Sequence, residues 1–204
     1  MLQNTTYNIQ HKMFNEDWYL DSQLDDLINL YEKTKNIHGK VIEIGCWEGK
    51  STIQIANACF PETLICNDTW LGNVKESEIT GITHVTETIL KERDVYGIFV
   101  DNMNKYTQQN YVIVKEDCLD WLKLFDETET VKFIHIDGSH EYESVFETIQ
   151  LILPKMVKGG IICGDDYQTA NITRTDLHGG VERAVKEALP NHSNINNLWY
   201  AIIE

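Results

Sequence analysis

The segment VIEIGCWEGKSTIQIANACF, residues 41–60, decides the fold. Its first six residues are rich in β-branched side chains and are broken by a glycine, which predicts a short buried strand. Its last ten residues, 51–60, have helical spacing with a serine at the start, which predicts a helix. A strand, a glycine turn and a helix in this order are the first unit of a sheet whose strands are joined by helices.

The same alternation continues along the chain. Apolar runs predict strands at 63–68, 111–117, 131–137 and 159–166, and helical spacing predicts helices at 22–35, 119–125, 142–157 and 180–189, with Ser22 as the cap of the first. This order predicts an α/β fold with a doubly wound, mainly parallel sheet covered by helices on both faces. The run 198–204 has no helix after it, so we expect it to close the sheet as an antiparallel edge strand.

The chain has 204 residues, enough for one well-buried core, and we expect a single domain over 1–204 with an N-terminal helical extension at 1–39. Segment 71–110 is polar and long for a connection. We expect it to carry a helix near 101–106 and to form a lid over a site.

The charge excludes some classes of partner. With 32 acidic and 17 basic residues the net charge is −15, which argues against binding to nucleic acid or an anionic membrane, but would not repel a sulfonium or a divalent cation. The five cysteines are scattered without a CxxC pair, and no apolar run approaches the ~18 residues of a membrane span. We therefore expect a cytoplasmic protein with reduced thiols.

An acid or a glycine turn follows each predicted parallel strand. Because carboxyl ends of parallel strands meet at one edge of a sheet, these residues are expected to converge on one crevice. Asp and Gly are also ordinary turn formers, so each one taken alone has a plain structural explanation. The set consists of Glu43 with Gly45 and Gly49, then Asp68, Asp117, Asp137 and the pair Asp165 and Asp166.

The first two strand ends indicate a cofactor with a ribose. Gly45 and Gly49 allow backbone amides to approach a ligand, although Cys46, Trp47 and Glu48 between them do not form the GxGxxG dinucleotide pattern. Asp68 is placed to accept hydrogen bonds from a ribose diol. Both nicotinamide dinucleotide and S-adenosylmethionine present such a diol.

Several segments together resemble one family. Six segments spread over about 40–189 resemble the class I S-adenosylmethionine-dependent methyltransferases, which have a Rossmann-like fold. The segments are VIEIGCWEGKST, NDTW, KEDCLDWL, FIHIDGSHEYESV, LPKMVKGGIICGDDY and GGVERAVKEAL. The similarity is to the small metal-associated O-methyltransferases that modify sugars of macrolides and polysaccharides. Trp47 and Glu48 stand where many members have small residues.

The resemblance implies a role for each strand-end residue. Glu43, Gly45 and Gly49 would shape the methionine pocket, Asp68 would bind the ribose, and Asp117 and Cys118 would border the adenine. Asp137, Asp165 and Asp166 would hold a divalent metal, and His140 would act with Asp137 in catalysis as the general base.

Chemical reasoning supports these roles. A hydroxyl is a poor nucleophile until it loses its proton or binds a metal, and carboxylate ligands suit Mg²⁺ better than zinc. His140 has the side chain whose usual pKa lies nearest neutrality. Plain alternatives stay open: Asp165 and Asp166 as a solvated turn, and His140 as a cap of the helix near 142.

Other residues allow two interpretations as well. His135 lies inside a predicted strand, which favours a structural histidine over a ligand. Trp47 and Trp70 would either stack near the cofactor or fill the core, and Lys50 would either meet the cofactor carboxylate or remain solvated.

We therefore expect an O-methyltransferase that uses S-adenosylmethionine and Mg²⁺ on a hydroxyl of a sugar or small metabolite. Two rivals remain: a nicotinamide-dependent oxidoreductase, which would need a different glycine spacing and a tyrosine–lysine relay, and a noncatalytic cofactor-binding module. The acceptor and the oligomeric state, a homo-oligomer included, stay open.

Overall fold

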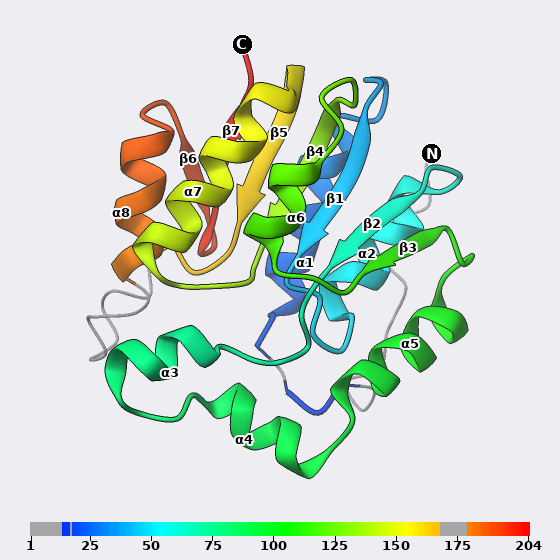
Figure 1. Ribbon diagram of the computed structural model, residues 1–204. Coiled ribbons are helices and arrows are strands. Elements are labelled where there is room, and N and C mark those ends of the chain that lie inside the picture. The colour runs from blue at the N-terminus through cyan, green and yellow to red at the C-terminus, as the bar shows by residue number, and fades with distance from the viewer. Residues whose placement is uncertain (1–13, 17, 168–178) are drawn as a thin grey trace.

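A seven-stranded sheet with the order β3-β2-β1-β4-β5-β7-β6 runs through the protein (Figure 1). The structure is a computed structural model that describes residues 14–16, 18–167 and 179–204. Strands β1 to β5 are parallel, and β7 is antiparallel to both β5 and β6. The strands are β1 (Lys40–Ile44), β2 (Leu64–Asn67), β3 (Tyr111–Val114), β4 (Val131–Ile136), β5 (Met156–Gly164), β6 (Ser193–Ile195) and β7 (Leu198–Ile202).

Helices cover both faces of the sheet, as Figure 1 shows. One buried cluster joins the sheet to α1 (Asp21–Glu32), α2 (Lys50–Cys59) and α5 (Val95–Tyr106). A second cluster, on the other face, joins it to α6 (Cys118–Leu124), α7 (Tyr142–Ile152) and α8 (Gly179–Ala188). The expected doubly wound sheet with an antiparallel edge strand is therefore confirmed.

Some element boundaries differ from the expected ones. The N-cap of α1 is Leu20 rather than Ser22, because the Gln23 side chain accepts the Leu20 backbone N–H at 3.0 Å. Helix α7 ends at Ile152 rather than 157. The short 3₁₀-helix η1 (Leu153–Lys155) follows it, because Pro154 has no N–H and crowds the preceding helical turn. Strand β6 was not expected.

Segment 71–110 contains the expected helix over 101–106, which begins earlier than expected, and two further helices that were not expected. The three helices are α3 (Val74–Thr80), α4 (Val85–Glu92) and α5, which begins at Val95. His84 and Asp94 accept backbone N–H groups at the starts of α4 and α5, and these caps fix where the helices begin. Helices α3 and α4 lie beyond the carboxyl ends of the strands (Figure 1). Helices α3 and α4 thus lie at the edge of the sheet where the predicted site residues are, and the lid stays a prediction.

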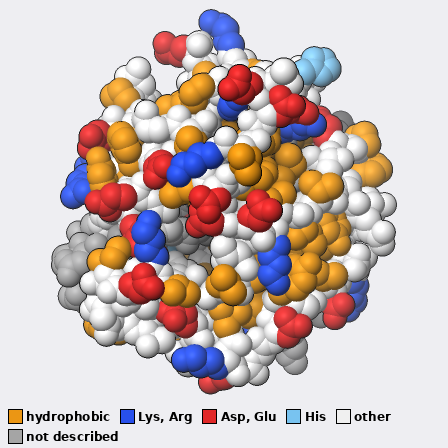
Figure 2. All heavy atoms as spheres, in the orientation of Figure 1, with side chains coloured by type: hydrophobic (Ala, Val, Ile, Leu, Met, Phe, Trp, Pro, Cys, Tyr) orange, Lys and Arg blue, Asp and Glu red, His pale blue; other side chains and the backbone are white. Residues whose placement is uncertain are grey.

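The surface and the helix lengths bear on possible partners. Lys and Arg side chains lie scattered among acidic ones on the face shown in Figure 2. Of the helices in the described part of the chain, none is both long and apolar enough to cross a membrane.

Candidate functional site

The register of the sheet places the strand ends in one row. Ile44 of β1 pairs with Asn67 of β2 and with Ile136 of β4, and Ile136 pairs with Gly164 of β5. The next residue of each strand is therefore at the same edge. These next residues are Gly45, Asp68, Asp137 and Asp165, four of the predicted site residues.

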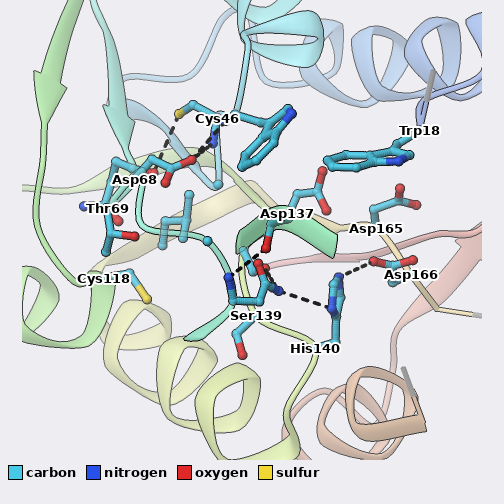
Figure 3. A pocket seen from close by; sticks show the side chains of 18 of the residues that line it. Trp18, Cys46, Asp68, Thr69, Cys118, Asp137, Ser139, His140, Asp165 and Asp166 are labelled. Carbon is cyan, nitrogen blue, oxygen red and sulfur yellow. Dashed lines mark hydrogen bonds and ion pairs between the residues drawn. The ribbon is translucent and has the colours of Figure 1, made fainter. Parts of the chain in front are cut away.

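A cavity of about 460 Å³ lies over this row. In Figure 3 Asp137, Asp165 and Asp166 group at one end beneath Trp18, whereas Asp68 and Cys46 lie at the other end. Among the predicted site residues, Glu43 and Gly49 do not line the cavity, although Gly49 adjoins the lining residue Glu48. The others line it; they are Gly45, Asp68, Asp117, Cys118, Asp137, His140, Asp165 and Asp166.

Asp68 organises the end of the cavity beside the glycine turn. Its carboxylate accepts backbone N–H groups from Cys46 at 2.8 Å, Trp47 at 2.9 Å and Trp70 at 2.7 Å. Trp47 and Trp70 both have a positive φ, so Asp68 holds two strained turns in place. Burial raises the pKa of Asp68, although the three N–H donors oppose that shift. A carboxylate has about four acceptor positions, which leaves about one for a ribose hydroxyl.

The glycine turn lies against the β4 strand end. Gly45 has a φ of +83°, and a Cβ atom on it would lie 2.0 Å from the Asp137 carbonyl oxygen. Gly49, with a φ of +93°, is the N-cap of α2. The backbone of the turn thereby lies in direct contact with the loop that carries Asp137, as expected if one ligand touches both.

Three carboxylates form the second end of the cavity. Asp137 and Asp165 follow neighbouring strands, and Asp166 has an αL backbone with a φ of +63°. Burial, then repulsion from Asp165 and Asp166, raises the pKa of Asp137 well above its ordinary value. Burial and the charge of Asp166 raise the pKa of Asp165 to about 6. Buried carboxylates that repel one another can be stabilised by a hard divalent cation, which prefers oxygen ligands.

Asp165 is also held from the surrounding segments. Its Oδ1 accepts from Gln23 at 3.3 Å and from Asn197 at 3.2 Å. Asp165 is only 8% exposed, so the interpretation of this residue as part of a solvated turn is wrong.

His140 lies between two acids. Its Nε2 is 2.8 Å from Asp166 Oδ2, and its Nδ1 is 3.0 Å from Glu76 Oε1. Burial lowers the pKa of His140, but these two carboxylates outweigh it and raise the pKa well above its ordinary value. The N-cap of α7 is Glu141, without a side-chain cap bond, so the alternative of His140 as the cap is wrong.

Glu76 and His84, both from segment 71–110, complete the surroundings of His140, and neither was predicted. Glu76 is 1% exposed and also accepts the His140 backbone N–H at 2.9 Å and the Asn73 amide at 2.7 Å. Burial favours the neutral form of Glu76, but the bonds from His140 prevail and lower its pKa to about 2. His84 Nε2 lies 3.8 Å from Glu76 Oε2. In the sequence, the only feature that could have pointed to Glu76 and His84 as site residues is their position at the starts of helices in a polar segment.

Glu43 lies below the cavity floor instead of lining it. Its Oε1 is 3.1 Å from His135 Nδ1, and His135 Nε2 is 2.8 Å from the Tyr19 hydroxyl. All three side chains are buried, and Tyr19 lines the cavity. His135 is therefore the structural histidine that was expected, and Glu43 reaches the cavity only through His135 and Tyr19.

The N-terminal segment forms a wall of the cavity that the sequence did not reveal. Trp18 packs against Trp47, with ring centroids 5.3 Å apart and ring planes tilted by 39°, and both side chains line the cavity. Lys50 Nζ donates to the Tyr19 carbonyl and so ties this segment to α2. Trp70 is buried against Tyr96 and Phe99 and belongs to the core.

Asp117 and Cys118 lie at the start of α6. Asp117 is the N-cap and accepts the backbone N–H groups of Leu119 and Asp120. Both residues line the cavity, next to the strand end of β3. This position is compatible with the adenine contact that the resemblance implies.

Comparisons with known proteins agree with this arrangement. A family model described as a methyltransferase domain matches residues 42–167. An uncharacterized protein, R132, of Acanthamoeba polyphaga mimivirus is 26% identical over 161 residues, which are 78% of this chain. The matched part spans 65% of the length of that relative.

Solved structures share the fold. The O-methyltransferase NovP matches with a TM-score of 0.68 and 19% identity over 89% of this chain and 79% of its own. A putative caffeoyl-CoA O-methyltransferase from Staphylococcus aureus matches with a TM-score of 0.63 and 13% identity, over 91% of this chain and 85% of its own. The calicheamicin methyltransferase CalS11 matches with a TM-score of 0.60 and 16% identity, over 90% of this chain and 80% of its own.

Proposed function

Since the chain belongs to the methyltransferase-domain family, we propose that it transfers a methyl group from S-adenosylmethionine to a hydroxyl with the help of a divalent cation, Mg²⁺ by preference. One observation carries the proposal: the glycine turn, the ribose acid and three further acids line one cavity with a histidine. A donor site and a hydroxyl-activating site thus adjoin each other.

S-adenosylmethionine supplies the electrophilic methyl group. Gly45 and Gly49 bring the backbone of the turn to the methionine moiety, and Asp68 offers its remaining acceptor position to the ribose. Asp117 and Cys118 border the adenine, and Glu43 acts through His135 and Tyr19 on the methionine end.

Asp137, Asp165 and Asp166 fit a divalent cation. The pKa values of Asp137 and Asp165 are raised, in part by the charge of Asp166, and this repulsion supports a cation site among the three carboxylates. A hard cation bound there would polarise the acceptor hydroxyl and lower its pKa. Carboxylate oxygens favour magnesium over zinc.

His140 is the residue that takes the hydroxyl proton. Its Nε2 faces Asp166 and its Nδ1 faces Glu76, so its ring orientation is fixed at both nitrogens. The two carboxylates favour the charged imidazole. A divalent cation held by Asp166 would draw that carboxylate away from His140 and lower the pKa of the ring, which would then be free to take the hydroxyl proton.

The acceptor class follows from the wall above the acids. Trp18 and Trp47 offer apolar ring faces next to the carboxylates, an arrangement suited to a sugar or another small ring that carries hydroxyls. A protein with this fold, CalS11, is named as a TDP-rhamnose 3′-O-methyltransferase. A sugar hydroxyl is accordingly the first acceptor to test.

The test is methyl transfer from labelled S-adenosylmethionine to a panel of sugar nucleotides, glycosides and catechols, with magnesium and with chelator. We expect methylated product for at least one acceptor, and a rate at least about a hundredfold lower in chelator, since such a cation supplies several kcal/mol. Tight donor binding without turnover on any acceptor would favour a noncatalytic module. Preference for nicotinamide dinucleotide would revive the oxidoreductase interpretation.

Replacement of Glu76 by glutamine tests how His140 is oriented. Glu76→Gln keeps the side-chain shape but removes the charge beside Nδ1, so we expect kcat to fall about 10–100-fold while KM for both substrates stays within about twofold. Glu78→Gln, an exposed glutamate on the same helix, is the matched control. Parallel changes of kcat and KM in Glu76→Gln would mean that Glu76 only supports the lid.

A further inference from the structure

A cluster next to the three acids combines two histidines and a carboxylate, and it meets the acids where His140 Nε2 lies 2.8 Å from Asp166. His84 and His140 each offer one ring nitrogen, and Glu76 offers a carboxylate oxygen, with all three atoms within 4.8 Å of one another. We propose that this cluster binds a zinc ion, and that zinc here opposes the action of magnesium at the acids.

The separations suit a small ion. His140 Nδ1 lies 3.0 and 3.3 Å from the two Glu76 oxygens, and His84 Nε2 lies 3.8 Å from Oε2. Ligand atoms on a tetrahedral zinc ion at 2.0–2.2 Å are about 3.3–3.6 Å apart. The two rings have centroids 6.2 Å apart, and the three ligand atoms lie within 4.8 Å of one another, so zinc binding would draw them together by at most about 1.5 Å.

The other nitrogen of each histidine has a partner of the kind that a metal ligand needs. His140 Nε2 meets the Asp166 carboxylate at 2.8 Å. His84 Nδ1 lies 2.9 Å from the Thr86 hydroxyl and, without zinc, accepts the Thr86 backbone N–H at 3.3 Å. Zinc binding at His84 Nε2 would move the ring proton to Nδ1, which would then donate it to the Thr86 hydroxyl. A metal-bound histidine donates its second N–H to such a group, which fixes the ring and makes the ligand nitrogen more basic. Both rings are therefore oriented in advance.

The chemistry of the donor set differs from that of the acids. Two imidazoles and one carboxylate suit zinc, whereas three carboxylates suit magnesium. Glu76 is buried, while both histidines line the cavity, so the fourth position of a tetrahedral ion would face the cavity and take water. The two sites are thus expected to select different ions.

Zinc in this cluster would connect helices α3 and α4 to the loop that carries His140. It would occupy His140 Nδ1, while Nε2 keeps its proton toward Asp166, so His140 could not act as a base. Zinc binding itself is independent of the proposed function; only its inhibitory consequence rests on that function.

Calorimetric titration of zinc into untagged, chelator-treated protein in excess magnesium tests the proposal. The informative variant is His84→Asn, because asparagine keeps the α4 N-cap but removes the imidazole. His38→Asn, on the chain just before β1, is the same change at the opposite end of the sheet. Asp165→Asn changes one of the three acids and none of the three proposed zinc ligands.

We expect one zinc ion per chain in the wild type, in His38→Asn and in Asp165→Asn, and at least about tenfold weaker binding in His84→Asn. No zinc binding by the wild type, or unchanged binding by His84→Asn, would overturn the proposal. Loss of binding in Asp165→Asn would overturn it too, since the ion would then occupy the acids. These outcomes are read from binding heats, so a failure to find methyl transfer leaves the result interpretable.

Discussion

Gly45→Ala is expected to abolish measurable S-adenosylmethionine binding and to destabilise the protein by about 3–5 kcal/mol, a shift of roughly 6–20 °C in Tm. Alanine at a φ of +83° is strained, and its Cβ would lie 2.0 Å from the Asp137 carbonyl oxygen. The contact is with backbone, so no side-chain rotation relieves it. The loop that carries Asp137 must move, and both ends of the cavity are then disturbed.

Calorimetry with the donor and thermal unfolding measure both effects. The matched control is Gly179→Ala at the start of α8, where an added Cβ meets nothing within 4 Å and the effect should stay within about 0.5 kcal/mol. Gly45→Ala protein with wild-type donor affinity and stability would show that the turn does not contact the ligand as described.

His140→Ala is expected to lower kcat by about 10²–10⁴-fold, the usual contribution of a positioned general base. Donor affinity should change by less than about twofold, because the side chain lies beside Asp166, away from Asp68. The backbone N–H of residue 140 keeps its bond to Glu76, so the loop should retain its position.

Steady-state kinetics on the acceptor found in the panel, with calorimetry for the donor, separate these quantities. His38→Ala serves as a control for the loss of a histidine, since His38 lies before β1. An equal loss of kcat and of donor affinity in His140→Ala would assign His140 a structural role instead.

The strand-end half of the site could be predicted because it depends on local patterns. Buried apolar runs define β1, β2, β4 and β5, and a parallel sheet brings their carboxyl ends together whatever the loops do. Asp68 and Asp137 were therefore found by position alone. Their further hydrogen bonds, such as the three that Asp68 accepts from backbone N–H groups, depend on turn conformations that the sequence pattern does not specify.

The half of the site that segment 71–110 supplies could not be predicted in the same way. Glu76 and His140 are 64 residues apart, and their contact depends on how α3 packs against the DGSH loop. Short polar helices such as α3 show weak periodicity, and their apolar side chains, such as Ile79, are partly left exposed. Trp18 likewise joined the site only through tertiary packing.

Calorimetric titration of magnesium into chelator-treated protein saturated with S-adenosylhomocysteine tests most directly whether the strand-end acids bind the cation. The wild type and Asp101→Asn, a change at an exposed aspartate of α5, should each bind one ion per chain. Asp165→Asn should bind at least about tenfold more weakly. Equal magnesium affinity in Asp165→Asn and the wild type, or no magnesium binding by the wild type, would contradict the metal-assisted mechanism.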